Sequence, residues 1–139
     1  MSGRFFLDTN IFVYAFDDTA QAKKRIASNL IREAIATRQG IVSYQVVQEF
    51  MNVAMRRFSH PMSHAEAEQY LANVLRPLLS IHSSSNLYLE ALRISGRHKF
   101  AWYDSLIVAG ALQGECATLL SEDLQTGRVV EGMKIENPF

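Results

Sequence analysis

The chain has 139 residues, 48% of them hydrophobic, enough for one globular domain that buries roughly two-thirds of its unfolded surface. Its 14 basic and 14 acidic residues balance to zero net charge, so strong non-specific attraction to nucleic acid is not expected. A single cysteine, Cys116, excludes an internal disulfide and fits a buried apolar position. No apolar run is long enough to span a membrane, and we expect a soluble, cytoplasmic single domain over residues 1–139.

The first apolar segment, residues 4–7, is predicted to be a strand that ends at Asp8. Residues 17–19, Asp-Asp-Thr, offer N-caps for a helix whose apolar side chains share one face. Gly40 is expected to stop that helix, because glycine readily adopts the conformation that ends one. A second short strand is therefore predicted at residues 41–43.

Two helices and a strand are predicted in the middle of the chain. In residues 44–58 the apolar positions form one stripe, with Glu49 at its margin, where its carboxylate can lean into a cleft. Residues 63–66, Ser-His-Ala-Glu, form a capping box that opens the next helix, which we expect to end before Pro77. Residues 78–82 are predicted to be the third strand.

Toward the carboxyl terminus, Ser84 or Ser85 can cap a helix that Gly96 is expected to end. Residues 103–112 are apolar nearly all round, as in a buried helix, with Asp104 in the first turn. The last predicted elements are strands at residues 117–120, which lead into Ser121, Glu122 and Asp123, and at residues 133–136.

Strands separated by helices imply parallel pairing through crossovers. We therefore predict an α/β fold, a three-layer α/β/α sandwich around a parallel sheet of about five strands. In such sheets ligands bind outside the carboxyl ends of the strands, where Asp8 and Asp123 both fall. Glu49 and Asp104, on sheltered helices, complete a set of four acids that can meet in one crevice.

Each acid alone has a structural explanation, as a helix cap, a first-turn residue or a solvated flank. Jointly they favour a site, but two carboxylates 4 Å apart repel by roughly 4 kcal/mol at an effective dielectric of 20. A divalent cation relieves that repulsion, and a ligand set of oxygens alone selects Mg²⁺ or Mn²⁺ over Zn²⁺. Such a site suits hydrolysis of phosphodiesters by metal-activated water.

We assign roles within this site on the same grounds. Asp8 and Asp104 are the expected principal metal ligands, and Glu49 and Asp123 are supporting ligands or position water. Asn10 and Ser121 are expected to hold the acids by hydrogen bonds.

Four motifs in order carry a family resemblance: residues 6–11 (FLDTNI), 48–50 (QEF), 103–109 (YDSLIVA) and 120–124 (LSEDL). With these motifs the chain resembles the PIN-domain ribonucleases, and it is most similar to the VapC toxins of toxin–antitoxin pairs. The resemblance implies a parallel sheet with an acidic pocket that binds Mg²⁺ or Mn²⁺ and cleaves RNA. It also implies a homodimer and a small antitoxin that blocks the pocket. The family's acids map onto Asp8, Glu49, Asp104 and Asp123, although Glu122 is also available for the fourth position.

Two other functions stay open. A non-catalytic RNA-binding or scaffolding PIN domain would be expected to lack some of the acids. A phosphatase of the haloacid-dehalogenase type also places an aspartate after its first strand, but it wants a second aspartate where Asn10 stands. His60 and His64 have a ligand-like spacing, but Pro61 lies between them and no third ligand accompanies them, so a zinc site is not expected.

Some patterns are interpreted as structural. Basic clusters, at residues 23–25, 56–57 and 97–99, are more often solvated helix faces than an RNA track. Aromatic side chains beside apolar runs, such as Trp102 and Tyr103, can stack on bases but are more often part of the core.

Overall fold

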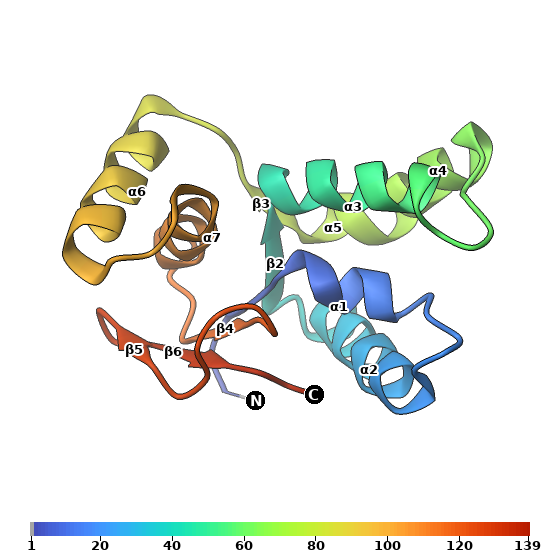
Figure 1. Ribbon diagram of the computed structural model, residues 1–139, viewed down its shortest axis with the longest axis horizontal. Coiled ribbons are helices and arrows are strands. Elements are labelled where there is room, and N and C mark those ends of the chain that lie inside the picture. Colours follow the sequence, from blue (N-terminus) through green and yellow to red (C-terminus); the bar gives the residue numbers. More distant parts are fainter. Residues whose placement is uncertain (1) are drawn as a thin grey trace.

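A computed structural model describes residues 2–139 and shows an α/β fold built on one six-stranded sheet (Figure 1). The strands are β1 (Phe5–Leu7), β2 (Gly40–Ser43), β3 (Leu79–Ile81), β4 (Thr118–Leu120), β5 (Val129–Val130) and β6 (Met133–Glu136). Their order in the sheet is β3-β2-β1-β4-β6-β5, and every neighbouring pair is parallel except β5 with β6. The predicted parallel sheet is confirmed. The sequence analysis did not predict β5, which is an antiparallel edge strand.

Helices cover both faces of this sheet. They are α1 (Thr9–Tyr14), α2 (Gln21–Thr37), α3 (Tyr44–Arg56), α4 (His64–Tyr70), the π-helical segment η1 (Leu71–Leu75), α5 (Arg76–Leu78), α6 (Ser85–His98) and α7 (Trp102–Gln113). In Figure 1, α6 and α7 lie on one side of the sheet, and α1 to α5 lie on the other. This is the expected three-layer sandwich. Within the described residues, no helix combines the length and the apolar character that crossing a membrane requires.

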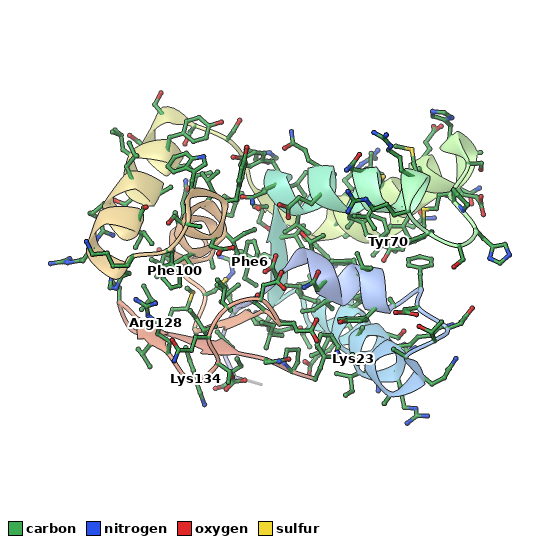
Figure 2. All side chains as sticks on the ribbon, in the orientation of Figure 1. Phe6, Lys23, Tyr70, Phe100, Arg128 and Lys134 are labelled. Carbon is green, nitrogen blue, oxygen red and sulfur yellow. The ribbon has the colours of Figure 1, made fainter. Side chains whose placement is uncertain are left out.

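The central strands are buried on both faces because helices cover each of them. All three residues of β1 are at most 1% exposed, and Phe6 lies in the middle of the molecule (Figure 2). Strands of this kind are expected to be continuously apolar rather than alternating, as Phe-Phe-Leu is. Helix α7 is buried from Ser105 to Ala111, as its apolar sequence predicted. Cys116 is 6% exposed, and burial raises the pKa of its thiol to about 11, which fits an apolar filler.

Helix α2 begins and ends differently from the prediction. Its N-cap is Ala20, whose methyl side chain cannot accept a capping hydrogen bond. The Asp17 carboxylate accepts instead from the backbone N–H of Thr19, at 2.9 Å. The helix ends at Thr37, and Arg38 takes the left-handed conformation with φ 59°. Gly40 does not stop the helix but opens β2, where a Cβ would lie 2.2 Å from the Cβ of Ala34. Its role is to let α2 and β2 approach closely.

The expectation that Pro77 marks the end of a helix was also wrong. The chain stays helical through Pro77 because the preceding segment widens into the π-helix η1, in which the N–H of Arg76 donates to the carbonyl of Leu71. A wider turn relieves the contact of the proline ring with the preceding backbone. Gly96 likewise does not end α6, which continues to His98 before Lys99 takes φ 64°.

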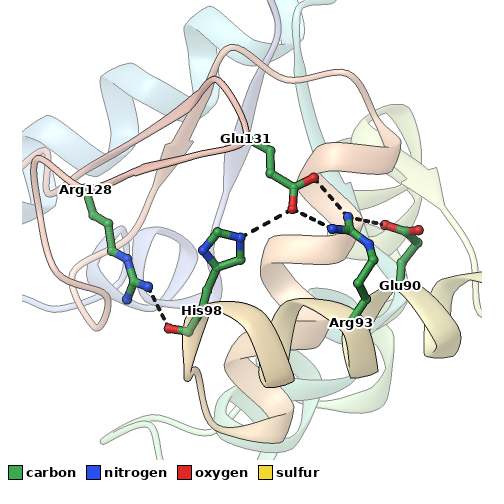
Figure 3. A network of polar contacts seen from close by, with 5 residues as sticks. All are labelled: Glu90, Arg93, His98, Arg128 and Glu131. Atoms are coloured by element: carbon green, nitrogen blue, oxygen red, sulfur yellow. Dashed lines mark hydrogen bonds and ion pairs between the residues drawn. The ribbon is translucent and has the colours of Figure 1, made fainter.

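An ion-pair network fastens the β5–β6 turn to α6 (Figure 3). The Arg93 guanidinium donates to both oxygens of Glu131, at 2.7 and 2.9 Å, and to Glu90 at 2.8 Å. Arg128 donates to the carbonyl of His98 at 2.6 Å and lies over the ring of Phe100, 4.2 Å from its centroid (Figure 2). These contacts hold the edge of the sheet against the α6–α7 layer.

Candidate acidic site at the carboxyl ends of β1 and β4

The site begins where two neighbouring strands end together. Leu7 and Leu120 are paired in the parallel β1–β4 ladder, so the next residues, Asp8 and Ser121, emerge side by side. The backbone N–H of Asp8 donates to the carbonyl of Leu120 at 3.0 Å, and the Ser121 hydroxyl donates to Oδ2 of Asp8 at 2.7 Å. The hydrogen bond expected of Ser121 is therefore present.

Asp8 also caps α1, a short helix that the sequence analysis did not predict. Its Oδ1 accepts from the backbone N–H of Thr9 at 2.7 Å. The interpretation of Asp8 as a helix cap is therefore correct, but it does not account for the pKa of this carboxyl. Hydrogen bonds to a carboxylate lower its pKa, whereas the pKa of Asp8 is raised. Burial, which leaves Asp8 only 7% exposed, raises that pKa to about 6, and the negative charges of Glu49 and Asp123 add to the effect.

Glu49 reaches the same crevice from α3. Its Oε1 accepts from the Thr9 hydroxyl at 2.6 Å, and its Oε2 accepts from the Gln45 amide at 3.2 Å. The same Gln45 nitrogen lies 3.2 Å from the carbonyl oxygen of Tyr103, so it joins α3 to the start of α7. The sequence analysis missed both Thr9 and Gln45. The available signals were the position of Thr9 next to Asp8 and the one-turn spacing of Gln45 and Glu49 on one helix face.

Asp104 and Asp123 lie close to these two acids. Asp104, in the first turn of α7, is partly buried, and burial raises the pKa of its carboxyl, followed by the charges of Asp123 and Glu49. The side chain of Asp123 is exposed to solvent, and its backbone N–H donates to the Ser121 hydroxyl at 3.2 Å. The structure thus brings together all four acids that the sequence analysis selected, from four separate elements.

The adjacent Glu122 belongs to a different set of contacts. Its carboxylate accepts from the Tyr14 hydroxyl at 2.5 Å and from the Lys23 ammonium at 2.6 Å, and these partners lower its pKa. Lys23 lies on α2, so Glu122 fastens the β4 end to the α1–α2 pair (Figure 2). Of the two neighbouring acids, only Asp123 raises the pKa of Asp8 and Asp104.

Charge pairing separates the four acids from the other acids of the fold. Within residues 2–139, the ion pairs of the structure involve Asp18, Glu90, Glu122, Glu131 and Glu136, and none involves Asp8, Glu49, Asp104 or Asp123. Buried or crowded carboxylates without a cationic partner are costly, so the crevice favours a positive ligand.

The oxygen donors of this crevice fit Mg²⁺ or Mn²⁺. In the described part of the chain, no group of three His, Cys, Asp or Glu side chains is close enough together to coordinate one metal ion. Mg²⁺ does not require a closed protein cage, because it keeps several waters and is commonly bound through one or two carboxylates.

Asn10 was expected to hold the acids, but it makes no hydrogen bond to any of them among the described residues. Thr9, its neighbour, donates to Glu49 instead. His60 and His64 are exposed in the loop and helix start beyond α3, away from the acids.

The structure is thus an α/β protein with a mostly parallel sheet and with acids clustered beyond the carboxyl ends of adjacent strands, the edge at which such sheets commonly bind ligands. The sequence matches the PIN domain family over residues 5–131. The chain therefore belongs to the PIN domain family, which confirms the resemblance carried by its acidic motifs.

Solved structures of similar fold agree with this assignment. A toxin–antitoxin complex from Klebsiella pneumoniae matches with a TM-score of 0.68 at 18% identity, covering 99% of this chain and 98% of that one. VapBC2 of Rickettsia felis, bound to a DNA fragment from its promoter, matches with a TM-score of 0.65 at 18% identity, over 96% and 97% of the two chains. VapC20 of Mycobacterium tuberculosis, described as a sarcin-ricin loop cleaving toxin, matches with a TM-score of 0.60 at 18% identity, over 86% and 89%. No curated protein matches the sequence.

Proposed function

We propose that this protein is a metal-dependent endoribonuclease that hydrolyses RNA phosphodiester bonds and serves as the toxin of a toxin–antitoxin pair. The proposal rests on one observation: Asp8, Glu49, Asp104 and Asp123 gather at one crevice, and none of them has a cationic partner among residues 2–139. The pKa values of Asp8 and Asp104 are both raised, first by burial and then by the negative charges of Glu49 and Asp123, which supports a crowded and poorly hydrated acidic site. A site that only needed caps or solvated flanks would not accumulate that cost.

The residues divide naturally between binding and support. Asp8 and Asp104 are the proposed principal ligands of Mg²⁺ or Mn²⁺, and Glu49 and Asp123 complete its surroundings or orient water. Ser121 and Thr9 hold two of these carboxylates in place through hydrogen bonds of 2.7 and 2.6 Å. When bound, the cation would supply the positive charge that stabilises a phosphodiester undergoing hydrolysis and would favour ionisation of water. No nucleophilic side chain is required.

Family membership and fold support the RNA substrate and the toxin role. The chain is a PIN domain, and the proteins of similar fold include toxins found with their antitoxins. By that likeness we propose a small antitoxin as the partner and a homodimer as the assembly. Membership of the PIN family disfavours the haloacid-dehalogenase alternative, and the full set of acids disfavours a non-catalytic PIN domain.

The test is cleavage of structured RNAs by the purified protein with Mg²⁺, with Mn²⁺ or with EDTA, followed by mapping of the new ends. We expect cleavage at defined positions with either cation and none with EDTA. Asp8→Asn and Asp104→Asn should each lower the cleavage rate by 100-fold or more, on the order expected when a metal site is lost. Equal cleavage by the wild type and both variants would contradict the proposal.

A further inference from the structure

A groove of about 500 Å³ lies beside the acids, between the start of α3 and the starts of α6 and α7. Four of its seven lining residues are aromatic, namely Tyr44, Tyr88, Trp102 and Tyr103. Its volume falls within the roughly 300–1,000 Å³ of common small-ligand sites. The groove is therefore large enough to receive part of a substrate, and its lining determines which part.

The groove and the acidic crevice are formed by neighbouring residues of the same two helices, α3 and α7. Tyr103, which lines it, directly precedes Asp104, and Gln48, another lining residue, directly precedes Glu49. Gln45 fixes this relationship, because its amide nitrogen contacts both the Glu49 carboxylate and the Tyr103 carbonyl at 3.2 Å. A group seated in the groove would thus lie near the phosphodiester bond proposed to be hydrolysed at the acidic site.

The aromatic side chains of the groove are unusually accessible. Tyr103 is 67% exposed, Tyr88 is 41% exposed and Trp102 is 37% exposed. The rings of Tyr88 and Trp102 lie 6.5 Å apart at an interplanar angle of 37°, which leaves faces open to solvent. Exposed aromatic clusters are uncommon on surfaces that bind nothing. The sequence-based assignment of Trp102 and Tyr103 to the core was therefore wrong.

The charge of the groove indicates which part of an RNA would enter it. None of its seven lining residues is charged, and the neighbouring crevice is negative. Such a surface has no cationic group to neutralise a phosphate, whereas aromatic faces stack on any nucleobase. The hydroxyl of Tyr44 and the amide of Gln48 can hydrogen-bond to the edge of a stacked base.

We propose that this aromatic groove binds an unpaired nucleobase next to the scissile phosphodiester. This inference rests on the proposed ribonuclease function and adds a base-binding site, with its residues, to it. Bases of an A-form duplex are stacked and paired and cannot enter, whereas bases of loops can be splayed out onto aromatic side chains.

Trp102 provides a direct readout, because it is the only tryptophan of the chain. Binding is measured by its fluorescence in the Asp8→Asn protein, so that the RNA is not cut. The probes are a short oligoadenylate, a duplex of the same length and an abasic strand of the same length. We expect the oligoadenylate to quench Trp102 and the other two probes to have little effect. Equal quenching by the abasic strand or the duplex would overturn the proposal.

Substitutions at Tyr103 supply the second arm. Tyr103→Ala should weaken oligoadenylate binding by roughly 10-fold or more, while Tyr103→Phe, which keeps the stacking face, should stay within about two-fold. Val129→Ala is the matched control, an exposed apolar side chain on β5 that does not line the groove. Equal binding by Tyr103→Ala and Tyr103→Phe would overturn the proposal, as would a change of oligomeric mass in Tyr103→Ala with RNA binding unchanged.

RNA cleavage by Tyr103 variants that keep Asp8 distinguishes failure of the base-binding proposal from failure of the proposed ribonuclease function. Tyr103→Ala should raise the KM for a looped RNA by roughly 10-fold or more and leave kcat much closer to wild type. Cleavage of RNA with an unchanged KM in Tyr103→Ala would contradict base binding in the groove and would still support the ribonuclease function. Base-dependent quenching without any cleavage by the wild type would overturn the nuclease and support the groove as a base-binding site.

Discussion

The Ser121 hydroxyl donates a 2.7 Å hydrogen bond to Oδ2 of Asp8 and so joins the ends of two strands 113 positions apart in the chain. Ser121 is fully buried, and its oxygen also accepts from the backbone N–H of Asp123. One serine thus positions a principal acid of the proposed site and the loop that carries another. The strand pairing of β1 with β4 makes this arrangement possible.

Replacing Ser121 with alanine should therefore weaken metal binding without removing any proposed ligand. We expect the Mg²⁺ affinity to fall by roughly 10-fold or more, as is usual when the hydrogen-bond partner of a ligand is lost. Unfolding should become easier by about 1–3 kcal/mol, because a buried carboxylate loses a donor. Calorimetric titration with Mg²⁺ and chemical denaturation measure the two effects. Ser59→Ala, at an exposed position, is the control, and unchanged Mg²⁺ affinity in Ser121→Ala would contradict the assigned role.

The pH dependence of stability follows from the raised pKa of Asp8. Its pKa rises from 3.8 to about 6 on folding, so the folded protein binds more protons than the unfolded chain between these values. In the metal-free protein, Asp8 should therefore contribute a loss of about 3 kcal/mol of stability as pH rises from about 4 to about 6. Denaturation in EDTA across this range measures the slope. Asp8→Asn should flatten it, and a slope that persists unchanged in Asp8→Asn would assign it to another group.

Neighbouring acids after β4 should differ in their effects. Asp123→Asn should lower Mg²⁺-dependent RNA cleavage by about 10-fold or more, because Asp123 interacts with Asp8 and Asp104. Glu122→Gln should retain most of the cleavage, because Glu122 contacts Tyr14 and Lys23 instead. Initial rates at saturating Mg²⁺ compare the two variants directly. The opposite ranking would place Glu122 in the site.

At the sheet edge, the Arg93–Glu131 pair should contribute little stability. Both side chains are roughly a third exposed, so Glu131→Gln should cost about 0.5–1 kcal/mol despite the two-point contact, and less at high salt. Chemical denaturation at low and high ionic strength tests this expectation. Glu68→Gln, an exposed acid of α4, serves as the control. A loss of several kcal/mol in Glu131→Gln would show that the network does more than fasten the β5–β6 turn.

The sequence was sufficient for the five parallel strands and for selecting the four acids, but not for the antiparallel edge strand β5. Short apolar runs that end in Asp8 or Ser121 predict strands and place polar groups at one sheet edge, whatever the exact helix ends. The sequence did not locate where helices stop, because those ends depend on tertiary contacts. Gly40 is needed for the approach of α2 to β2, and Pro77 stays helical because the π-helical turn before it is wide.

Supporting contacts of the site were the harder part. Thr9 and Gln45 contact Glu49 through side-chain hydrogen bonds, which their positions beside Asp8 and one helical turn from Glu49 allow but do not establish. The aromatic groove was missed for a related reason. Trp102 and Tyr103 are the first residues of the apolar helix α7, so their sequence is typical of a core, yet the helix buries its residues only from Ser105 onward.

The central claim is that a divalent cation relieves the repulsion among the four acids, and thermal unfolding at about pH 7.5 tests it most directly. The melting temperature of the wild type should rise with increasing Mg²⁺ or Mn²⁺, while Asp8→Asn and Asp104→Asn should start at least as stable in EDTA and respond little. No rise in the wild type, or an equal rise in both variants, would contradict the account.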